Sequence, residues 1–271
     1  MSFVCNRTVK GGRIAMKYMT YNIRNMNDDH GPHAWDNRKE HLAALIAWRA
    51  PDILCVQEAF WPQMVYLKEH LPGYDFYGVG RDDGDKAGEY AAVFYRTDRF
   101  TLLEGRTFWL SETPDRPSRG WDASFHKRIC TIAVLAPLDG GTPICVASLH
   151  LDNDGAEARR QSALLLRRVF TPISEQYQCF IAGDYNAEPC DEPFRIMNEP
   201  PFYDARTTAD EFSDFETFNG FAIDHVTFGA GPIDHIFYTK GALRPVCAEI
   251  LTTKRGGDFP SDHFPLLCTF E

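Results

Sequence analysis

The chain has 271 residues, of which 44% are hydrophobic and 13% aromatic, and this suits a globular protein with a sizeable core. Its 28 Lys and Arg residues stand against 38 Asp and Glu residues, so the formal net charge is −10. That balance excludes a global positive field that would attract nucleic acid, and any such contact would have to be local. No apolar run is long enough to predict a membrane span.

The eight cysteines show neither the spacing of a zinc site nor a secreted disulfide framework. Several of them, such as Cys55 and Cys145, lie inside apolar runs of strand character. We therefore expect reduced, mostly buried thiols in a cytoplasmic protein. Residues 1–15 contain basic residues but no apolar core of signal-peptide length, and we expect a disordered leader there.

Strand and helix patterns alternate in the first half of the chain. The β-branched and aromatic residues of 17–23 predict a strand. Asp36 is expected to cap a helix that ends before Pro51. The charged, glycine-rich loop 80–88 is expected to be solvated. Further predicted elements are strands over 52–57, 74–79 and 90–95 and a helix over 62–70. A strand within 100–110 is expected to lie beside the strand 90–95 in the same sheet.

Hairpin patterns dominate the second half. Strands 129–135 and 143–151 are expected to pair across a turn at 139–142. Asp154 and Glu157 form an Asp variant of the capping box, which predicts a helix to about Phe170. The other expected elements are a strand before Asp184, a helical segment near 192–197, a loop region to Phe221, and strands at 233–238, 247–252 and 264–270.

The mixture of alternating and hairpin patterns predicts an α/β protein in which two packed sheets are covered by helices. No obvious linker divides the chain, so we expect one domain over residues 16–271. Both halves would contribute loops at strand ends to one site. The long loop 111–120 is suited to variable substrate contacts, because loops tolerate change better than the elements they connect.

The stretch from Cys179 to Pro189 carries the main chemical signal. An apolar strand runs into Gly183, and Asp184 and Asn186 follow two residues apart, so both side chains would leave the strand end on the same face. Such a pair can hold and polarise one water molecule. Gly-Asp-x-Asn is equally typical of an ordinary turn, so other parts of the chain have to decide between the two interpretations.

Polar side chains also stand where other apolar strands end, and sites on sheet scaffolds are built at such places. Each has a purely structural interpretation as a cap, a turn residue or a core histidine. Their joint occurrence favours a single site over a series of coincidences. The residues are Asn22, Glu58, His150, Asp184 with Asn186, Asp234, and Asp262 with His263.

The order and wording of these motifs resemble the endonuclease/exonuclease/phosphatase superfamily, which includes deoxyribonuclease I-like nucleases, apurinic endonucleases, deadenylases and sphingomyelinases. The resemblance extends from Lys17 to Phe270. It implies a four-layer α/β sandwich of two mixed sheets flanked by helices, and divalent-metal-dependent cleavage of phosphoester bonds. The motifs are T-Y-N-I, V-Q-E, S-L-H-L, I-A-G-D-Y-N-A-E-P, I-D-H-I-F-Y and S-D-H-F-P-L.

The resemblance implies a metal site and an attacking water. Mg²⁺ or Mn²⁺ would be held by Glu58, with Asn22 and Asp262 close by, because these ions take hard oxygen ligands. Asp184 would orient or deprotonate the water, and Asn186 would hold that water or the phosphate.

Charge also develops on the phosphate oxygens, and donors are needed there. His150, His263 and Asn22 would supply them, and Asp234 would keep His263 protonated and aimed. In deoxyribonuclease I-like enzymes an acid at the spacing of Glu89 pairs with the histidine at the His150 position. Glu89 can equally be a loop acid that begins an edge strand. Arg128 is a further candidate for the same cleft.

Two departures refine the resemblance. The S-L-H histidine places the chain nearer the deoxyribonuclease, deadenylase and sphingomyelinase branches than the apurinic endonucleases. Ile-Asp-His occurs twice, at 223–225 and 233–235. We choose Asp234 because a strand follows it, and we expect His225 and His235 to be nonfunctional.

We predict a monomeric phosphodiesterase or nuclease that attacks nucleic acid or a nucleotide with an activated water. The alternative is a phosphatase or phosphodiesterase of a small phosphorylated metabolite, a sugar phosphate or a lipid head group. A binding module without catalysis is disfavoured because every motif residue is present. A local patch would serve nucleic acid, namely Arg116, Arg119, Lys127 and Arg128 with Trp109, Trp121 and Phe125.

Overall fold

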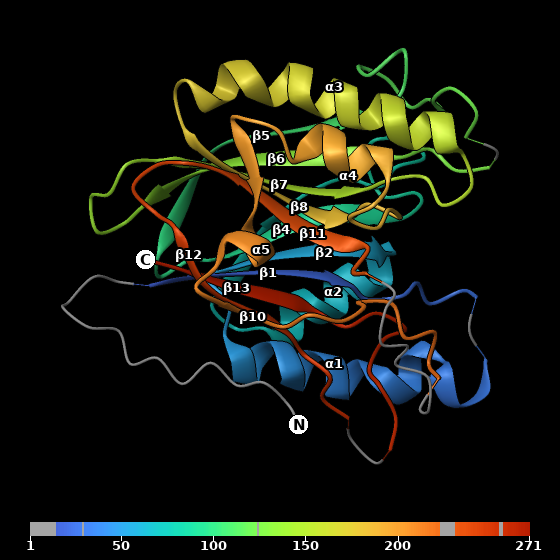
Figure 1. The fold of residues 1–271 in the computed structure, drawn as a ribbon. Helices are drawn as coiled ribbons and strands as arrows, with labels where there is room; N and C mark the ends of the chain where they lie inside the picture. The colour runs from blue at the N-terminus through green and yellow to red at the C-terminus, as the bar shows by residue number, and fades with distance from the viewer. Residues whose placement is uncertain (1–14, 29, 124, 223–230, 255–256) are drawn as a thin grey trace.

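The strands form two sheets that are stacked face to face and covered by helices on both outer sides (Figure 1). The computed structural model describes residues 15–28, 30–123, 125–222, 231–254 and 257–271. The expected leader, apart from Ala15, and the first Ile-Asp-His sequence lie outside these ranges. The expected four-layer α/β sandwich is confirmed.

The first sheet has the strand order β10-β12-β13-β1-β2-β4-β3. β1 and β2 are parallel, and the crossover between them contains α1, which lies below the sheet in Figure 1. The elements of this half are β1 (Met16–Asn22), η1 (Gly31–His33), α1 (Trp35–Arg49), β2 (Ile53–Ala59), α2 (Trp61–His70), β3 (Tyr74–Tyr77), β4 (Tyr90–Arg96), β10 (Glu211–Phe212), β12 (Pro245–Ile250) and β13 (Leu266–Phe270).

The second sheet has the order β5-β6-β7-β8-β11-β9, with β7 and β8 parallel and α3 and α4 above it in Figure 1. β5 pairs with β6 in this sheet, so the expectation that it would lie beside β4 was wrong. The elements are β5 (Phe100–Trp109), β6 (Ile129–Pro137), β7 (Ile144–His150), α3 (Ala156–Ser174), β8 (Gln178–Asp184), α4 (Glu192–Met197), β9 (Phe202–Asp204), α5 (Ala205–Thr208) and β11 (Asp234–Thr239).

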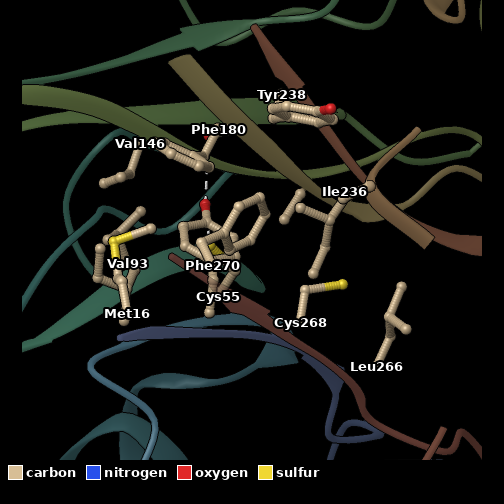
Figure 2. Packing of buried hydrophobic residues seen from close by; sticks show 14 of the residues in the cluster. Met16, Cys55, Val93, Val146, Phe180, Ile236, Tyr238, Leu266, Cys268 and Phe270 are labelled. Carbon is tan, nitrogen blue, oxygen red and sulfur yellow. Dashed lines mark hydrogen bonds between the residues drawn. The ribbon is translucent and has the colours of Figure 1, made fainter. Parts of the chain in front are cut away.

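A buried apolar layer fills the space between the sheets. Figure 2 shows Phe180 and Ile236 of the second sheet together with Cys268 and Phe270 of the first. The rings of Phe180 and Phe270 pack edge to face at 5.0 Å. All these residues alternate with side chains that face the helices, as the two-residue period of strands requires.

Buried hydrogen bonds cross this apolar layer. The Tyr18 hydroxyl on β1 lies 3.2 Å from the carbonyl oxygens of both Ala147 and Phe180 in the second sheet. The Gln57 amide donates to Ser148 Oγ at 3.1 Å, and that hydroxyl donates in turn to the Val56 carbonyl. Burial raises the pKa of Tyr18 well above its usual value, so it stays a neutral hydroxyl. These contacts define how the two sheets are aligned.

The helix starts differ from the sequence expectations. α1 begins at Trp35, so Asp36 lies in its first turn and Ala34 is the N-cap. The expected Asp154 and Glu157 capping box is absent, and Gly155 is the N-cap of α3. Asp122 from a distant loop supplies the acceptors instead, at 3.2 Å from the Glu157 N–H and 2.6 Å from the Ala158 N–H.

Several elements were missed or cut short by the sequence expectations. The region expected to be a loop up to Phe221 contains β9, α5 and β10. α3 continues through Pro172 to Ser174. The described cysteines are all free thiols, and all but Cys190 are buried. In the described ranges, no helix combines the length and apolarity needed to cross a membrane.

The cap on α3 gives a first prediction. Asp122→Ala should lower the free energy of unfolding by about 1 kcal/mol, because two N–H groups of the first helical turn lose their acceptor. Urea denaturation followed by circular dichroism measures this. Asp154→Ala is the matched control and should cost less than about 0.5 kcal/mol. A larger loss in the control would place the cap within the local sequence after all.

Candidate active site

The polar residues expected to act together meet at one end of the sandwich. Asn22 ends β1 and Glu58 lies at the end of the parallel strand β2. In the second sheet, His150 and Asp184 are direct neighbours at the ends of the parallel strands β7 and β8, and Asp234 is the antiparallel neighbour of Asp184. Strand ends from both sheets therefore build one cleft.

Asp184 is the hub of this cleft. Its Oδ2 lies 3.0 Å from Asn22 Nδ2, 3.4 Å from His150 Nε2 and 3.7 Å from His263 Nε2. Asp184 is 1% exposed. Burial and the nearby Asp234 carboxylate raise the pKa of Asp184 to about 7. A carboxylate with such a pKa is suited to accept a proton near neutral pH.

Asn186 turns back toward Asp184. Its backbone N–H donates to Asp184 Oδ1 at 2.9 Å, and its backbone adopts a left-handed conformation with φ of 45°. The stretch is thus both a turn and part of the site. Asn186 Nδ2 lies 3.2 Å from His150 Nε2. Gly183 is required by close packing, because a Cβ atom there would lie 2.0 Å from the Leu149 carbonyl oxygen.

His263 and Asp234 form a buried ion pair. The distance from His263 Nδ1 to Asp234 Oδ2 is 2.8 Å. Burial alone would lower the pKa of His263, but the Asp234 and Asp184 carboxylates outweigh it and raise the pKa to about 10. His263 is therefore a cation at neutral pH. These three side chains lie close enough together to hold a metal ion, and His263 would have to give up its Nε2 proton to serve as a ligand there.

His150 differs from His263 in charge. Burial and the guanidinium groups of Arg128 and Arg81 hold the pKa of His150 well below its usual value, so it is neutral. The pairing with Glu89 that the resemblance implied does not form: Glu89 binds Arg81 at 2.5 Å, and His150 Nδ1 has no hydrogen-bond partner among the described residues. Burial raises the pKa of Glu89 by more than the positive charge of Arg81 lowers it, and the resulting pKa is about 7.

Glu58 and Asp262 supply carboxylates from two different segments to the cleft. Glu58 lies at an irregularity in the pairing of β2 with β4 and has a left-handed φ of 64°. Arg24 Nη1 lies 3.6 Å from Asp262 Oδ2 and 4.0 Å from Glu58 Oε2. The buried carboxylate of Asp262 and the partly buried one of Glu58 are a hard-oxygen donor set that suits Mg²⁺ or Mn²⁺.

Asn22 does not fit its expected role as a metal ligand. Its Nδ2 donates to Glu58 Oε1 and Asp184 Oδ2, each at 3.0 Å, and its Oδ1 accepts the Arg24 backbone N–H at 3.0 Å. Because both neighbours on one side are carboxylates, the amide must present its NH₂ group to them. Asn22 is therefore a donor, and Glu58 and Asp262 remain as the candidate ligands.

Eight residues that were not assigned from the sequence also line the cleft, which has a volume of about 400 Å³, and four of them bear on its chemistry. Arg81 is buried there, so the expectation of a solvated loop over 80–88 fails for this residue. The only sequence signal for a role of Arg81 was its position beside a glycine-rich turn. Arg24 directly follows the first motif and was missed. The other two are Asn153 and Phe218.

The remaining candidates divide between cleft and core. Arg128 lines the cleft as expected and binds Asp152 at 3.3 Å. His235 is buried and contacts the Ala187 carbonyl oxygen, so it lies in the core. Trp109 is buried, and its indole N–H donates to the Arg81 carbonyl oxygen. It is therefore not available as part of the expected nucleic-acid stacking patch.

A two-sheet sandwich with acidic residues and histidines at its strand ends defines a deoxyribonuclease I-like protein of the class that hydrolyses phosphoesters. The chain belongs to the endonuclease/exonuclease/phosphatase family, whose model matches residues 19–263. It is 33% identical to a mannosyl-6-phosphatase of Bacteroides thetaiotaomicron, with a TM-score of 0.87 and coverage of 94% of this chain and 99% of that one.

Two curated sequences are also similar. An uncharacterized protein of Acanthamoeba polyphaga mimivirus is 26% identical, and the match covers 59% of this chain and 62% of that protein. A probable RNA exonuclease of Schizosaccharomyces pombe is 25% identical over 68% of this chain and 38% of its own length. The chain thus spans less than two thirds of either relative.

The ion pair of His263 gives a second prediction. Asp234→Asn should move the pKa of His263 from about 10 toward 6.5, because the main attractive charge is lost. An NMR titration of the imidazole measures this. Since the folded pKa lies above the unfolded one, the pair stabilises the wild type below about pH 6.5 and loses its effect as pH rises through about 10. An unchanged pKa would contradict the assignment.

Proposed function

We propose that this chain is a divalent-metal-dependent phosphatase that removes the phosphate of a small phosphorylated sugar. The observation that carries the proposal is the convergence of Asn22, His150 and His263 on the Asp184 carboxylate, in the same cleft as Glu58 and Asp262. A base, donors and candidate metal ligands together meet the needs of phosphoester hydrolysis.

In this proposal the side chains divide the work of a direct attack by water. Asp184 orients the water and accepts its proton, with Asn186 beside it. The cationic His263, aimed by Asp234, and the Asn22 amide donate to the phosphate oxygens. Glu58 and Asp262 would hold Mg²⁺ or Mn²⁺, which when bound neutralises charge on the phosphate. His150, being neutral, contributes a hydrogen bond and no charge.

A small substrate is favoured over nucleic acid because the cleft offers little net positive charge. Each of its arginines lies against a carboxylate: Arg24 against Asp262, Arg81 against Glu89 and Arg128 against Asp152. The net charge of −10 acts in the same direction. A polyanion requires cations that follow its backbone, whereas one phosphate requires only a local site. The similarity to the mannosyl-6-phosphatase supports the sugar phosphate.

The metal site gives a third prediction. Glu58→Gln should weaken Mn²⁺ binding about tenfold or more, because a ligand carboxylate becomes a neutral amide. Mn²⁺ titration followed by electron paramagnetic resonance measures this without any turnover. Asp184→Asn is the matched isosteric control: it should keep most of the Mn²⁺ affinity and lose hydrolysis. Equal Mn²⁺ affinity in Glu58→Gln and wild type would remove Glu58 from the metal site.

A substrate panel gives a fourth prediction. With Mg²⁺, the protein should hydrolyse hexose 6-phosphates faster than an oligonucleotide or bis-p-nitrophenyl phosphate, and the Asp184→Asn variant serves as the blank. Between 50 and 200 mM salt, the KM for the sugar phosphate should change less than about threefold, since few ion contacts form. Preferred cleavage of the oligonucleotide with a steep salt dependence would establish a nuclease in place of the sugar phosphatase.

A further inference from the structure

Phe218 is an aromatic side chain that remains exposed at the wall of the catalytic cleft. It is 47% exposed, while its neighbours Thr217 and Asn219 are almost fully buried. Its side chain lines the cleft together with His263 and Ile233. An exposed apolar ring at the wall of a polar cleft is suited to contact a ligand there.

The backbone around Phe218 is held firmly in place. Phe218 forms an antiparallel bridge with His263. The Thr217 carbonyl accepts the Phe264 N–H at 2.6 Å, and the Asn219 N–H donates to the Asp262 carbonyl at 2.7 Å. Phe218 is thus attached on both sides to the segment that carries the two catalytic candidates Asp262 and His263.

The ring of Phe218 is also oriented. Its centroid lies 5.1 Å from that of His263, with an angle of 69° between the ring planes. This edge-to-face contact restrains the ring next to the proposed phosphate position. Phe221, three residues later, stacks on His33 with ring centroids 4.2 Å apart. The two phenylalanines of this loop therefore have different surroundings, and Phe218 is the one that lines the cleft.

We propose that Phe218 is a platform on which the ring of the sugar leaving group stacks, an assignment that rests on the proposed sugar phosphatase function. A pyranose has a face of C–H groups that packs on an aromatic ring, and hydroxyl groups at its edge that need polar partners. Arg81, Arg128 and Asn153 line the same cleft and offer such partners. One apolar wall with a few polar groups is the usual construction of a small-molecule site.

The test compares two phosphate esters that contain rings with one that is acyclic. Wild type, Phe218→Ala and Phe218→Tyr are assayed on mannose 6-phosphate, on glycerol 3-phosphate as the acyclic ester, and on adenosine monophosphate. In Phe218→Ala the KM for mannose 6-phosphate should rise about tenfold, the size expected for the loss of one stacked ring. Glycerol 3-phosphate hydrolysis should change less than about twofold, and Phe218→Tyr should restore the KM.

Phe212→Ala is the matched control, because Phe212 is a half-exposed phenylalanine on the edge strand β10 outside the cleft. An equal loss in kcat on mannose 6-phosphate and glycerol 3-phosphate would overturn the platform and make Phe218 a positioning residue for His263. Unchanged kinetics would overturn it as well. A tenfold effect confined to adenosine monophosphate would replace the sugar by a nucleobase.

Failure of the Phe218 platform and failure of the sugar phosphatase function give different results. If the wild type hydrolyses mannose 6-phosphate and the variants do not discriminate, the sugar phosphatase stands and the platform falls. If the wild type leaves all hexose phosphates intact, the proposed function itself falls. Binding of mannose 6-phosphate to Asp184→Asn and to the double variant Asp184→Asn/Phe218→Ala, followed by calorimetry, separates ring recognition from turnover. Equal affinity of the two would exclude the platform.

Discussion

The alignment of the two sheets is the constraint on which the site depends. Both sheets contribute residues to the cleft, and apolar packing alone is non-directional. The Tyr18 hydroxyl and the contact from Gln57 to Ser148 are directional and buried, so they oppose sliding of one sheet over the other. Gln57 immediately precedes Glu58, and Ser148 lies two residues before His150. The same segments therefore align the sheets and present the functional groups.

The chemistry of the cleft follows from burying charges that compensate one another. Asp184 and Asp234 are nearly inaccessible to solvent. The cationic His263 lies between their carboxylates, with Nδ1 toward Asp234 and Nε2 toward Asp184. Buried ion pairs of this kind contribute little net stability, but loss of one partner leaves a charge uncompensated. Perturbed pKa values of this origin are typical of sites that move protons. The neutral His150 beside them shows how burial, together with neighbouring arginines, lowers the pKa of an imidazole and sets the opposite protonation state.

Backbone conformation aims several of these groups. Glu58, Asn186 and Arg24 all have positive φ values, which non-glycine residues adopt at a cost. Arg24 and Asn186 each lie two residues beyond the end of a strand, and Glu58 is the penultimate residue of β2. The left-handed conformation of Glu58 coincides with the irregular pairing of β2 and β4. Three of the six non-glycine residues with positive φ in the described ranges thus lie where the strands deliver their polar ends to the cleft.

The sequence by itself determined most of the strands (though not β9 and β10), the layered fold and the set of strand-end residues such as Asp184 and His263, because alternation and short motifs are local signals. Only the tertiary structure decided that Glu89 binds Arg81, that Asn22 presents its NH₂ group, and that Asp122 caps α3. These depend on side chains from separate segments, which compete for one partner in a buried space. Local patterns predict which residues reach the site, and packing decides what each of them contacts.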